Sequence, residues 1–149
     1  MTDAKTGLYC ELDHRHFPGF YGILSEMELH NYQICVSQLQ MELTVRYTEP
    51  FLIEADRLLQ IVKEGMVWEL VFHLFPKDCT NVTPPPDYAS FKRGDCQSSI
   101  LIYDWHTLEC YTKSEAFLKR LWNYLEQMHP RLLEPTTEEE PGGREEFQV

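Results

Sequence analysis

A chain of 149 residues, 43% hydrophobic and 13% aromatic, can bury one core, which argues against global disorder. No apolar run approaches the roughly 20 residues of a membrane-spanning helix. A net charge of −11 disfavours direct binding of nucleic acid, since phosphates bind clustered Lys and Arg. Five scattered cysteines and no secretory leader pattern predict an intracellular protein of the cytoplasm or nucleus with reduced thiols.

The first part of the chain shows the two-residue period of β-strands. Hydrophobic and polar residues alternate from Leu39 to Tyr47, which predicts a strand over 39–47 with one buried face. A noisier alternation predicts another strand over 23–29, and residues 8–12 form a possible N-terminal strand. Residues 34–36 are out of phase with the run from Leu39, so we expect a β-bulge or a break near 37–38.

The pattern changes to that of a helix over residues 50–64. Hydrophobic residues recur there at helical spacing and form one apolar stripe. Pro50 suits the first helical position, and Gly65 suits the terminus. Residues 66–75, in contrast, are apolar on both faces, which predicts a central strand covered on both sides.

Regular patterns disappear from Pro76 to Ser98 and return afterwards. We expect residues 78–98 to form an exposed loop, because a connection of this length in a compact domain is usually functional or mobile. Residues 100–105 and 108–112 predict a hairpin. Residues 114–129 predict a final helix whose buried stripe includes Trp122 as a core anchor.

Together these elements predict an α+β fold. It is a single antiparallel-rich sheet packed by two helices, at about 50–64 and 114–129, in the order β-β-α-β-β-β-α. Residues 1–135 are expected to form one globular domain. Residues 136–149 contain five Glu and one Arg, a net charge of −4, and are expected to form an acidic flexible tail with almost nothing to bury.

A metal site near the N-terminus has only partial support. Cys10, His14 and His16 are suitable zinc ligands within seven residues of each other. A structural zinc site needs a fourth ligand, and the sequence nominates none. The ordinary interpretation is a polar N-terminal segment, so we predict no metal and no cofactor.

A catalytic site has even less support. Asp104, His106 and Cys110 supply an acid, a base and a thiol, but nothing indicates that the pKa of the thiol is lowered. Crowding at a hairpin explains these three residues. His73, inside an apolar strand, is expected to be a core histidine with satisfied hydrogen bonds. No catalytic residue and no small-molecule substrate is therefore predicted.

The long loop carries the first candidate binding residues. Tyr88, Phe91, Lys92 and Arg93 follow the prolines at 84–86, which favour an extended conformation with outward side chains. An aromatic residue beside cations in a loop is typical of a surface that recognises proteins. The alternative is a disordered connector.

Residues 147–149 carry the second set of candidate binding residues. Phe147 and Val149 are apolar residues two positions apart, the spacing with which a short segment can add a strand to a groove. We therefore include both among the predicted partner-binding residues.

The leading hypothesis for function is a non-enzymatic protein–protein interaction module, a small intracellular adaptor or complex subunit. Trp68, Trp105 and Trp122, with eight Tyr and eight Phe, supply more large anchors than a small core requires. One alternative is an acidic inhibitor that mimics nucleic acid and occupies a DNA- or RNA-binding protein. A second alternative is an enzyme that uses the Cys and His residues.

Overall fold

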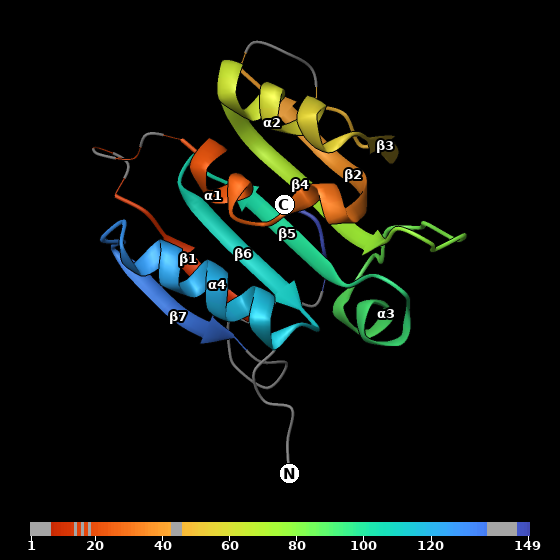
Figure 1. The fold of residues 1–149 in the computed structure, drawn as a ribbon. Helices are drawn as coiled ribbons and strands as arrows, with labels where there is room; N and C mark the ends of the chain where they lie inside the picture. Colours follow the sequence, from red (N-terminus) through yellow and green to blue (C-terminus); the bar gives the residue numbers. More distant parts are fainter. Residues whose placement is uncertain (1–6, 14, 16, 18, 43–45, 137–145) are drawn as a thin grey trace.

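The computed structural model describes residues 7–136 and 146–149, apart from residues 14, 16, 18 and 43–45. The described residues form an α+β fold in which one seven-stranded sheet carries four α-helices (Figure 1). The strand order is β3-β2-β4-β5-β6-β1-β7, and every neighbouring pair is antiparallel. The predicted fold class is confirmed.

The helices and strands have the following bounds. The strands are β1 (Gly7–Glu11), β2 (Tyr32–Met41), β3 (Phe51–Ile53), β4 (Val67–Pro76), β5 (Ser98–Tyr103), β6 (Thr107–Thr112) and β7 (Leu132–Thr136). The α-helices are α1 (Tyr21–Ser25), α2 (Ala55–Glu64), α3 (Tyr88–Arg93) and α4 (Glu115–Glu126), and a short 3-10 helix, η1 (Leu29–Asn31), leads into β2.

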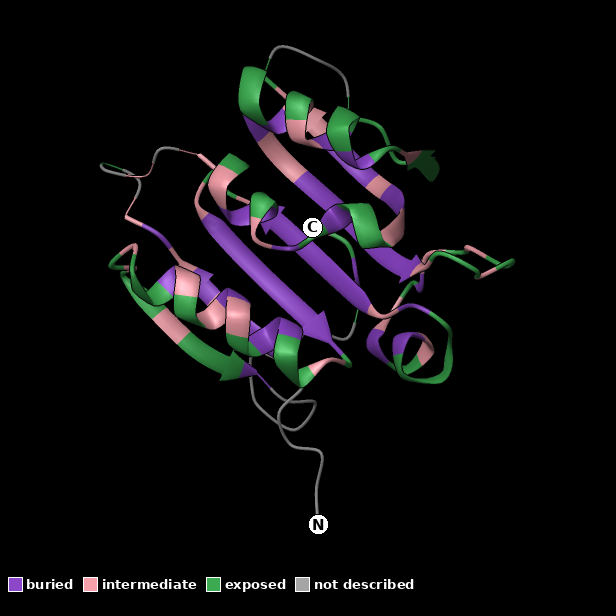
Figure 2. Ribbon diagram, viewed as in Figure 1, coloured by how far each residue is buried: buried purple, intermediate pink, exposed green. Residues whose placement is uncertain are grey.

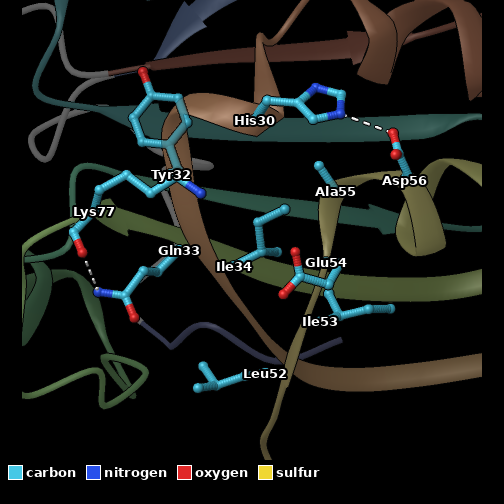
Figure 3. A pocket seen from close by; sticks show the side chains of 10 residues that line it. All are labelled: His30, Tyr32, Gln33, Ile34, Leu52, Ile53, Glu54, Ala55, Asp56 and Lys77. Atoms are coloured by element: carbon cyan, nitrogen blue, oxygen red, sulfur yellow. Dashed lines mark hydrogen bonds and ion pairs between the residues drawn. The ribbon is translucent and has the colours of Figure 1, made fainter.

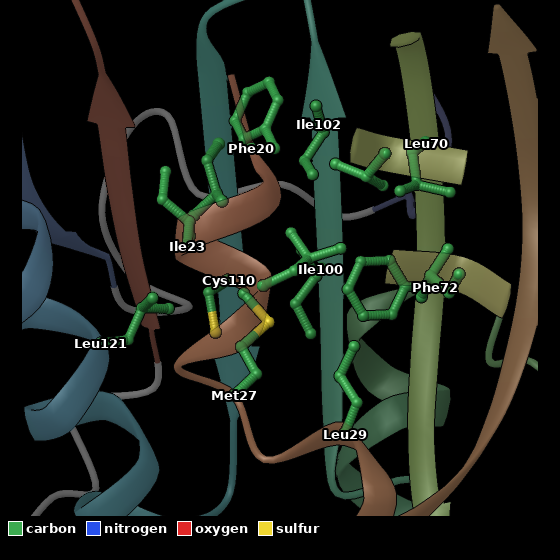
Figure 4. Close-up of a cluster of buried hydrophobic side chains, with 14 of the residues drawn as sticks. Phe20, Ile23, Met27, Leu29, Leu70, Phe72, Ile100, Ile102, Cys110 and Leu121 are labelled. Carbon is green, nitrogen blue, oxygen red and sulfur yellow. The ribbon is translucent and has the colours of Figure 1, made fainter. Parts of the chain in front are cut away.

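Three helices, α1, α2 and α4, cover one face of the sheet, which we call the front face (Figure 1). Alternate strand residues such as Leu70, Phe72 and Ile100 point toward these helices and are fully excluded from solvent. Ile23 of α1 and Leu121 of α4 pack over the strands (Figure 4). The outer sides of the helices are exposed (Figure 2). We call this apolar layer the front core.

The intervening strand residues face the opposite side, the back face. A second cluster of buried hydrophobic residues lies there, and we call it the back cluster: Cys35, Val71, Phe75, Tyr88, Phe91, Cys96, Leu101, Tyr111 and Phe147. Helix α3 covers part of this face. Asp87 is the N-cap residue of α3, and its Oδ1 accepts a hydrogen bond from the Ser90 N–H at 2.8 Å. The sheet therefore separates two different hydrophobic layers.

Several predicted elements are confirmed. The strand over 66–75 is β4, the hairpin is β5 and β6, and the final helix is α4. The Oγ of Ser114 accepts a hydrogen bond from the Phe117 N–H at 3.1 Å, which explains where α4 begins. The expected bulge is a register shift between β2 and β4 at Val36 and Gln38.

Two predicted strands are wrong. Residues 23–29 belong mainly to α1 and η1, because Ile23, Leu24 and Met27 also fit helical spacing and are buried together. The strand over 39–47 ends at Met41, and the chain turns back so that Tyr47 bridges Leu39. Alternation alone does not distinguish one long strand from two arms of a reversal, and residues 43–45 lie outside the described residues.

Four other features differ from the prediction. The helix expected from Pro50 begins at Ala55, because residues 51–53 pair with β2 as the edge strand β3. The expected loop contains α3, and the sequence patterns gave no sign of β7. Trp122 is half-buried and packs against the front core instead of lying inside it.

Candidate functional site

The back face holds the segment 146–149 against the sheet. The Phe147 side chain is 5% exposed and lies among four rings, which we call the aromatic box: His73, Tyr88, Phe91 and Tyr111. The Tyr111 ring stacks on it at 5.2 Å between centroids, and the Phe91 ring meets it edge-on at 5.9 Å. Three separate elements, β4, α3 and β6, therefore build one site for a phenyl ring.

Polar contacts fix the backbone of the segment at both ends. The Phe147 N–H donates to the Pro86 carbonyl at 2.9 Å, and Glu146 forms an antiparallel bridge with Asp87. The Gln38 amide donates to the Val149 oxygen at 2.9 Å and accepts from the Val149 N–H at 3.3 Å. The contacts with Pro86 and Asp87 are main-chain contacts of the kind that an added strand makes, whereas Gln38 acts through its side chain.

One cation, one carboxylate and an amide organise the Val149 end. Arg46 donates to the same Val149 oxygen, and its Nε lies 2.8 Å from Oε1 of Glu69. Glu69 also accepts from the Gln38 amide at 2.9 Å. Glu69 thus orients both donors toward one backbone oxygen, and the arrangement can hold a carbonyl or a carboxylate.

A buried polar chain lies beneath the Phe147 ring. His73 is fully buried, with its Nε2 2.8 Å from the Ser37 hydroxyl and its Nδ1 2.8 Å from the Ser99 hydroxyl. Burial lowers the pKa of His73 from 6.5 to about 3, so the ring is neutral at pH 7. Burial also raises the pKa of the neighbouring Cys96 thiol to about 11. The expected core histidine is confirmed, and it is poorly suited to act as a base near pH 7.

The floor of the aromatic box is held by a second buried polar group. The Glu109 carboxylate accepts a hydrogen bond from the Tyr111 hydroxyl at 2.8 Å and another from the Tyr103 hydroxyl. Glu109 is itself 2% exposed. It fixes the Tyr111 ring in the orientation that stacks on Phe147.

Cations border the site although the protein as a whole is acidic. The Lys92 ammonium lies 5.8 Å from the Tyr88 ring centroid, and the Lys113 ammonium lies 5.0 Å from that of Phe91. The pKa of Asp87 is lowered by its hydrogen bonds from Ser90, with a further contribution from the charge of Arg93. A segment with acidic residues before its aromatic residue suits this border.

A hollow lies beside the segment that occupies the site. It measures about 490 Å³ and is lined by Gln38, Arg46, Thr48, Glu146, Gln148 and Val149. Residues of segment 146–149 therefore form one wall of this hollow, opposite Arg46 and Thr48, and leave it open. We call the aromatic box and this hollow together the back groove.

The structure brings together most of the residues proposed from the sequence as binding residues. Tyr88, Phe91 and Phe147 meet in the aromatic box, and Val149 lies at the other end of the segment. The expectation that the loop is exposed is wrong for Tyr88 and Phe91, which are 9% and 2% exposed. The reason is that α3 turns both rings toward the sheet.

Lys92 and Arg93 are exposed on the outer side of α3. The expectation that the acidic tail has almost nothing to bury is also corrected, because Thr136 ends β7 and Phe147 fills the aromatic box. Residues 137–145 lie outside the described residues. The division into a domain over 1–135 and a separate tail stays a prediction.

Sequence reasoning missed the residues that complete the back groove: Gln38, Arg46, His73, Glu109 and Tyr111. A signal existed for some of them. Glu109 and Tyr111 occupy alternate positions of a predicted strand, and His73 interrupts an apolar one. Polar residues repeated on one face of central strands indicate a face with a special cover.

The predicted clusters of Cys and His do not form sites among the described residues. Cys10 is buried in the front core, and burial raises its pKa to about 12. His14 and His16 lie outside the described residues, so the structure does not test the predicted zinc site that includes them. Cys110 is buried in the front core, while Asp104 and His106 lie in the turn that follows β5. Within the described part of the chain, no group of three or more His, Cys, Asp or Glu is placed to hold a metal ion.

A smaller hollow of about 240 Å³ lies where β2, β3 and the start of α2 meet (Figure 3). Its mouth carries the His30 Nε2 to Asp56 Oδ1 contact of 2.8 Å, and both side chains are exposed. Gln33 on its wall donates to the Lys77 carbonyl. The hollow is smaller than the one in the back groove and no aromatic box adjoins it, so it offers less recognition chemistry.

Comparisons with known proteins add no assignment. No protein-family model matches the chain, and neither the curated proteins nor the solved structures give a significant match. None of the helices in the described part of the chain is long and apolar enough to cross a membrane.

Proposed function

We propose that this protein is a non-enzymatic protein–protein interaction module, an adaptor or complex subunit, that binds a short extended segment of a partner in the back groove. In the present conformation its own residues 146–149 occupy that groove. The observation that carries the proposal is the enclosure of Phe147 by four rings from three elements. Aromatic anchors in desolvated pockets dominate the energetics of protein recognition.

The partner segment should carry an aromatic residue followed two positions later by an aliphatic one. Acidic residues before the aromatic residue would suit the cationic border with Lys92 and Arg93, and in this sequence Glu145 and Glu146 precede Phe147. Gln38 and Arg46 would hold the backbone oxygen at the aliphatic position. The hollow beside Glu146, Gln148 and Val149 leaves room for larger side chains in a partner segment.

The back groove should exchange its occupant at modest cost. Burial of one phenyl ring contributes about 2 kcal/mol, which corresponds to about thirty closed molecules for each open one. A short tether supplies an effective concentration of about 1 mM. The same segment supplied as a free peptide should therefore bind an empty groove with a Kd of about 30 μM. In the wild type the internal segment should weaken that binding about thirtyfold.

A peptide titration on the full chain tests the proposal. The variant Phe147→Ala vacates the aromatic box while the rest of the chain is kept. We expect an acetylated peptide of residues 143–149 to bind this variant with a Kd of about 30 μM by calorimetry, and to bind the wild type about thirtyfold more weakly. The peptide with Ala at the position of Phe147 should not bind.

The matched control is Tyr47→Ala, which removes an aromatic side chain that is 54% exposed outside the groove. It should bind the peptide as the wild type does. Equal affinity of Phe147→Ala and the wild type would contradict the proposal, because the internal segment would then not compete. If the peptide does not bind Phe147→Ala, the groove serves only to bury residue 147 in the folded chain.

We further propose that the interaction takes place inside the cell. All five cysteines carry free thiols, and four of them are buried. Free thiols are typical of reducing compartments.

A further inference from the structure

The turn between β5 and β6 holds a tryptophan in a costly conformation. Asp104 and Trp105 both adopt positive φ angles, 53° and 68°. The turn has three residues, 104–106, and a non-glycine residue in the left-handed region costs about 1–2 kcal/mol. The Trp105 side chain is nevertheless 51% exposed, and its ring stacks on Trp68 at 5.7 Å between centroids. The turn therefore presents an indole face to solvent at a cost in stability.

A hollow of about 600 Å³ lies beside this ring, between the start of α1 and the end of α2. Phe17, Phe20 and Val67 form part of its apolar lining, and Met66 on its wall is 46% exposed. An exposed indole, an exposed thioether and a hollow thus share one surface. Such a surface can cover the methylene stem of a long side chain.

The charged groups of the hollow are mainly acidic. Glu42 and Glu64 line it, and Asp104 adjoins it through the turn. Lys63, the one cation among the described residues that line it, has its ammonium 5.3 Å from the Tyr21 ring centroid, so an aromatic face already holds it. The net charge of −11 adds a long-range field that attracts cations.

We propose that this hollow, which we call the Trp105 site, is a second interaction surface that binds an arginine side chain of a basic partner segment. The guanidinium stacks on the exposed face of Trp105 and pairs with Glu42 and Glu64, while the methylene stem covers Phe17 and Met66. Arginine suits the site better than lysine, because its planar, weakly hydrated head stacks on aromatic rings and pairs with carboxylates in a fork. The site is separate from the back groove and does not depend on its function.

A fragment titration by NMR tests this inference on the full chain. The probe is N-acetyl-arginine amide, and the readout is the indole N–H resonance of Trp105, assigned with Trp105→Phe. We expect a saturable shift with half-saturation on the order of 1 mM, the affinity of a small fragment with average efficiency. N-acetyl-citrulline amide, which has the same shape without the charge, should shift the resonance at least tenfold less.

Two variants locate the charge and the ring. Glu42→Gln with Glu64→Gln should weaken arginine binding about tenfold. The matched control, Glu115→Gln with Glu126→Gln on α4, removes the same charge from exposed positions elsewhere and should leave half-saturation within about twofold. Trp105→Gly should remove binding, followed through the resonance of Trp68, while it keeps or raises the melting temperature because the strain of the turn is relieved.

Three results would overturn the inference. The first is the absence of a saturable shift up to about 50 mM arginine probe, far above the expected half-saturation. The second is an equal response to the citrulline probe, which would indicate apolar binding without recognition of charge. The third is an equal loss of affinity in the control pair on α4, which would attribute binding to the overall field.

Discussion

The two faces of the sheet use the same strands for different purposes. In β4, Leu70 and Phe72 face three helices in a layer of hydrophobic side chains. The intervening residue Val71 faces a cluster that also contains buried polar groups, His73 among them. The front face is a core of buried hydrophobic side chains. The back face resembles a binding surface that happens to be covered.

The elements that cover the two faces also differ in size. The front core is covered mainly by α1, α2 and α4, which span 5, 10 and 12 residues. The back cluster is covered by the six-residue α3 and by segment 146–149. A small cover with few buried apolar contacts opens at lower free energy than the fold as a whole. The comparison teaches that burial alone does not identify the structural core of this protein.

The largest effect is expected from the front core. Phe72→Ala removes a fully buried ring from the central strand and should lower the free energy of unfolding by about 3–5 kcal/mol. Urea denaturation followed by circular dichroism measures this loss. A loss below about 1 kcal/mol would mean that the front layer is not a continuous core.

The pH dependence of stability should report the buried His73. The unfolded chain takes up a proton near pH 6.5 and the folded chain only near pH 3, so the unfolded state binds more protons in between. Stability should therefore fall as the pH falls from 6.5, by up to about 3 kcal/mol at pH 4.

Other groups also titrate in that range. The contribution of His73 is therefore measured as the difference between the wild type and His73→Gln in the loss of stability. The loss in the wild type between pH 6.5 and pH 4 should exceed that in His73→Gln. His129→Gln, at an exposed position, should keep the full pH dependence of the wild type. Equal pH profiles for the wild type and His73→Gln would show that the ring is accessible to protons in the folded state.

Loss of the Phe147 ring from the back face should lower the free energy of unfolding less than Phe72→Ala does. Phe147→Ala should lower the free energy of unfolding by about 2 kcal/mol, which is a fall of about 4–8 °C in melting temperature for a chain of this size. A chain that ends at Thr136 should melt within about 2 °C of Phe147→Ala, because the ring carries most of the contribution. If neither change affects melting, the segment adds nothing to the fold, as the sequence alone suggested.

A smaller loss is expected from the floor of the aromatic box. Tyr111→Phe deletes the hydroxyl that donates to the buried Glu109 carboxylate and should cost about 1–2 kcal/mol. The matched control Tyr21→Phe, at an exposed position, should be neutral. Affinity of the free peptide should also fall when this change is combined with Phe147→Ala. An unchanged affinity would show that Glu109 does not position the ring for binding.

The smallest effect on stability is expected at the cationic border. Lys92→Ala with Arg93→Ala should change stability by less than about 0.5 kcal/mol, since both side chains are exposed. In the Phe147→Ala background the same changes should weaken binding of the acidic peptide about threefold at low salt, and this difference should shrink as salt is raised. A difference that persists in high salt would indicate a role other than charge.

Strong local patterns predicted much of the fold. The apolar run of β4, the hairpin and the stripe of α4 each combine period, length and a terminating residue, so competing structures are few. Residues 23–29 and 51–53 were assigned wrongly, because a short apolar segment fits more than one period and the neighbouring elements decide between them. Of the site, the aromatic residues of α3 and of segment 146–149 were proposed, but in separate roles and with the wrong exposure.

The sequence by itself determined that this chain folds as an α+β domain around aromatic anchors, because alternation and helical spacing are local properties. Only the tertiary structure decided that Phe147 meets Tyr88, Phe91 and Tyr111, since these residues come from segments that are distant along the chain. The same holds for the polar partners beneath them. A hydrogen bond between Glu109 and Tyr103, or between His73 and Ser37, depends on strand register. Register follows from the packing of both faces at once, which no single segment encodes.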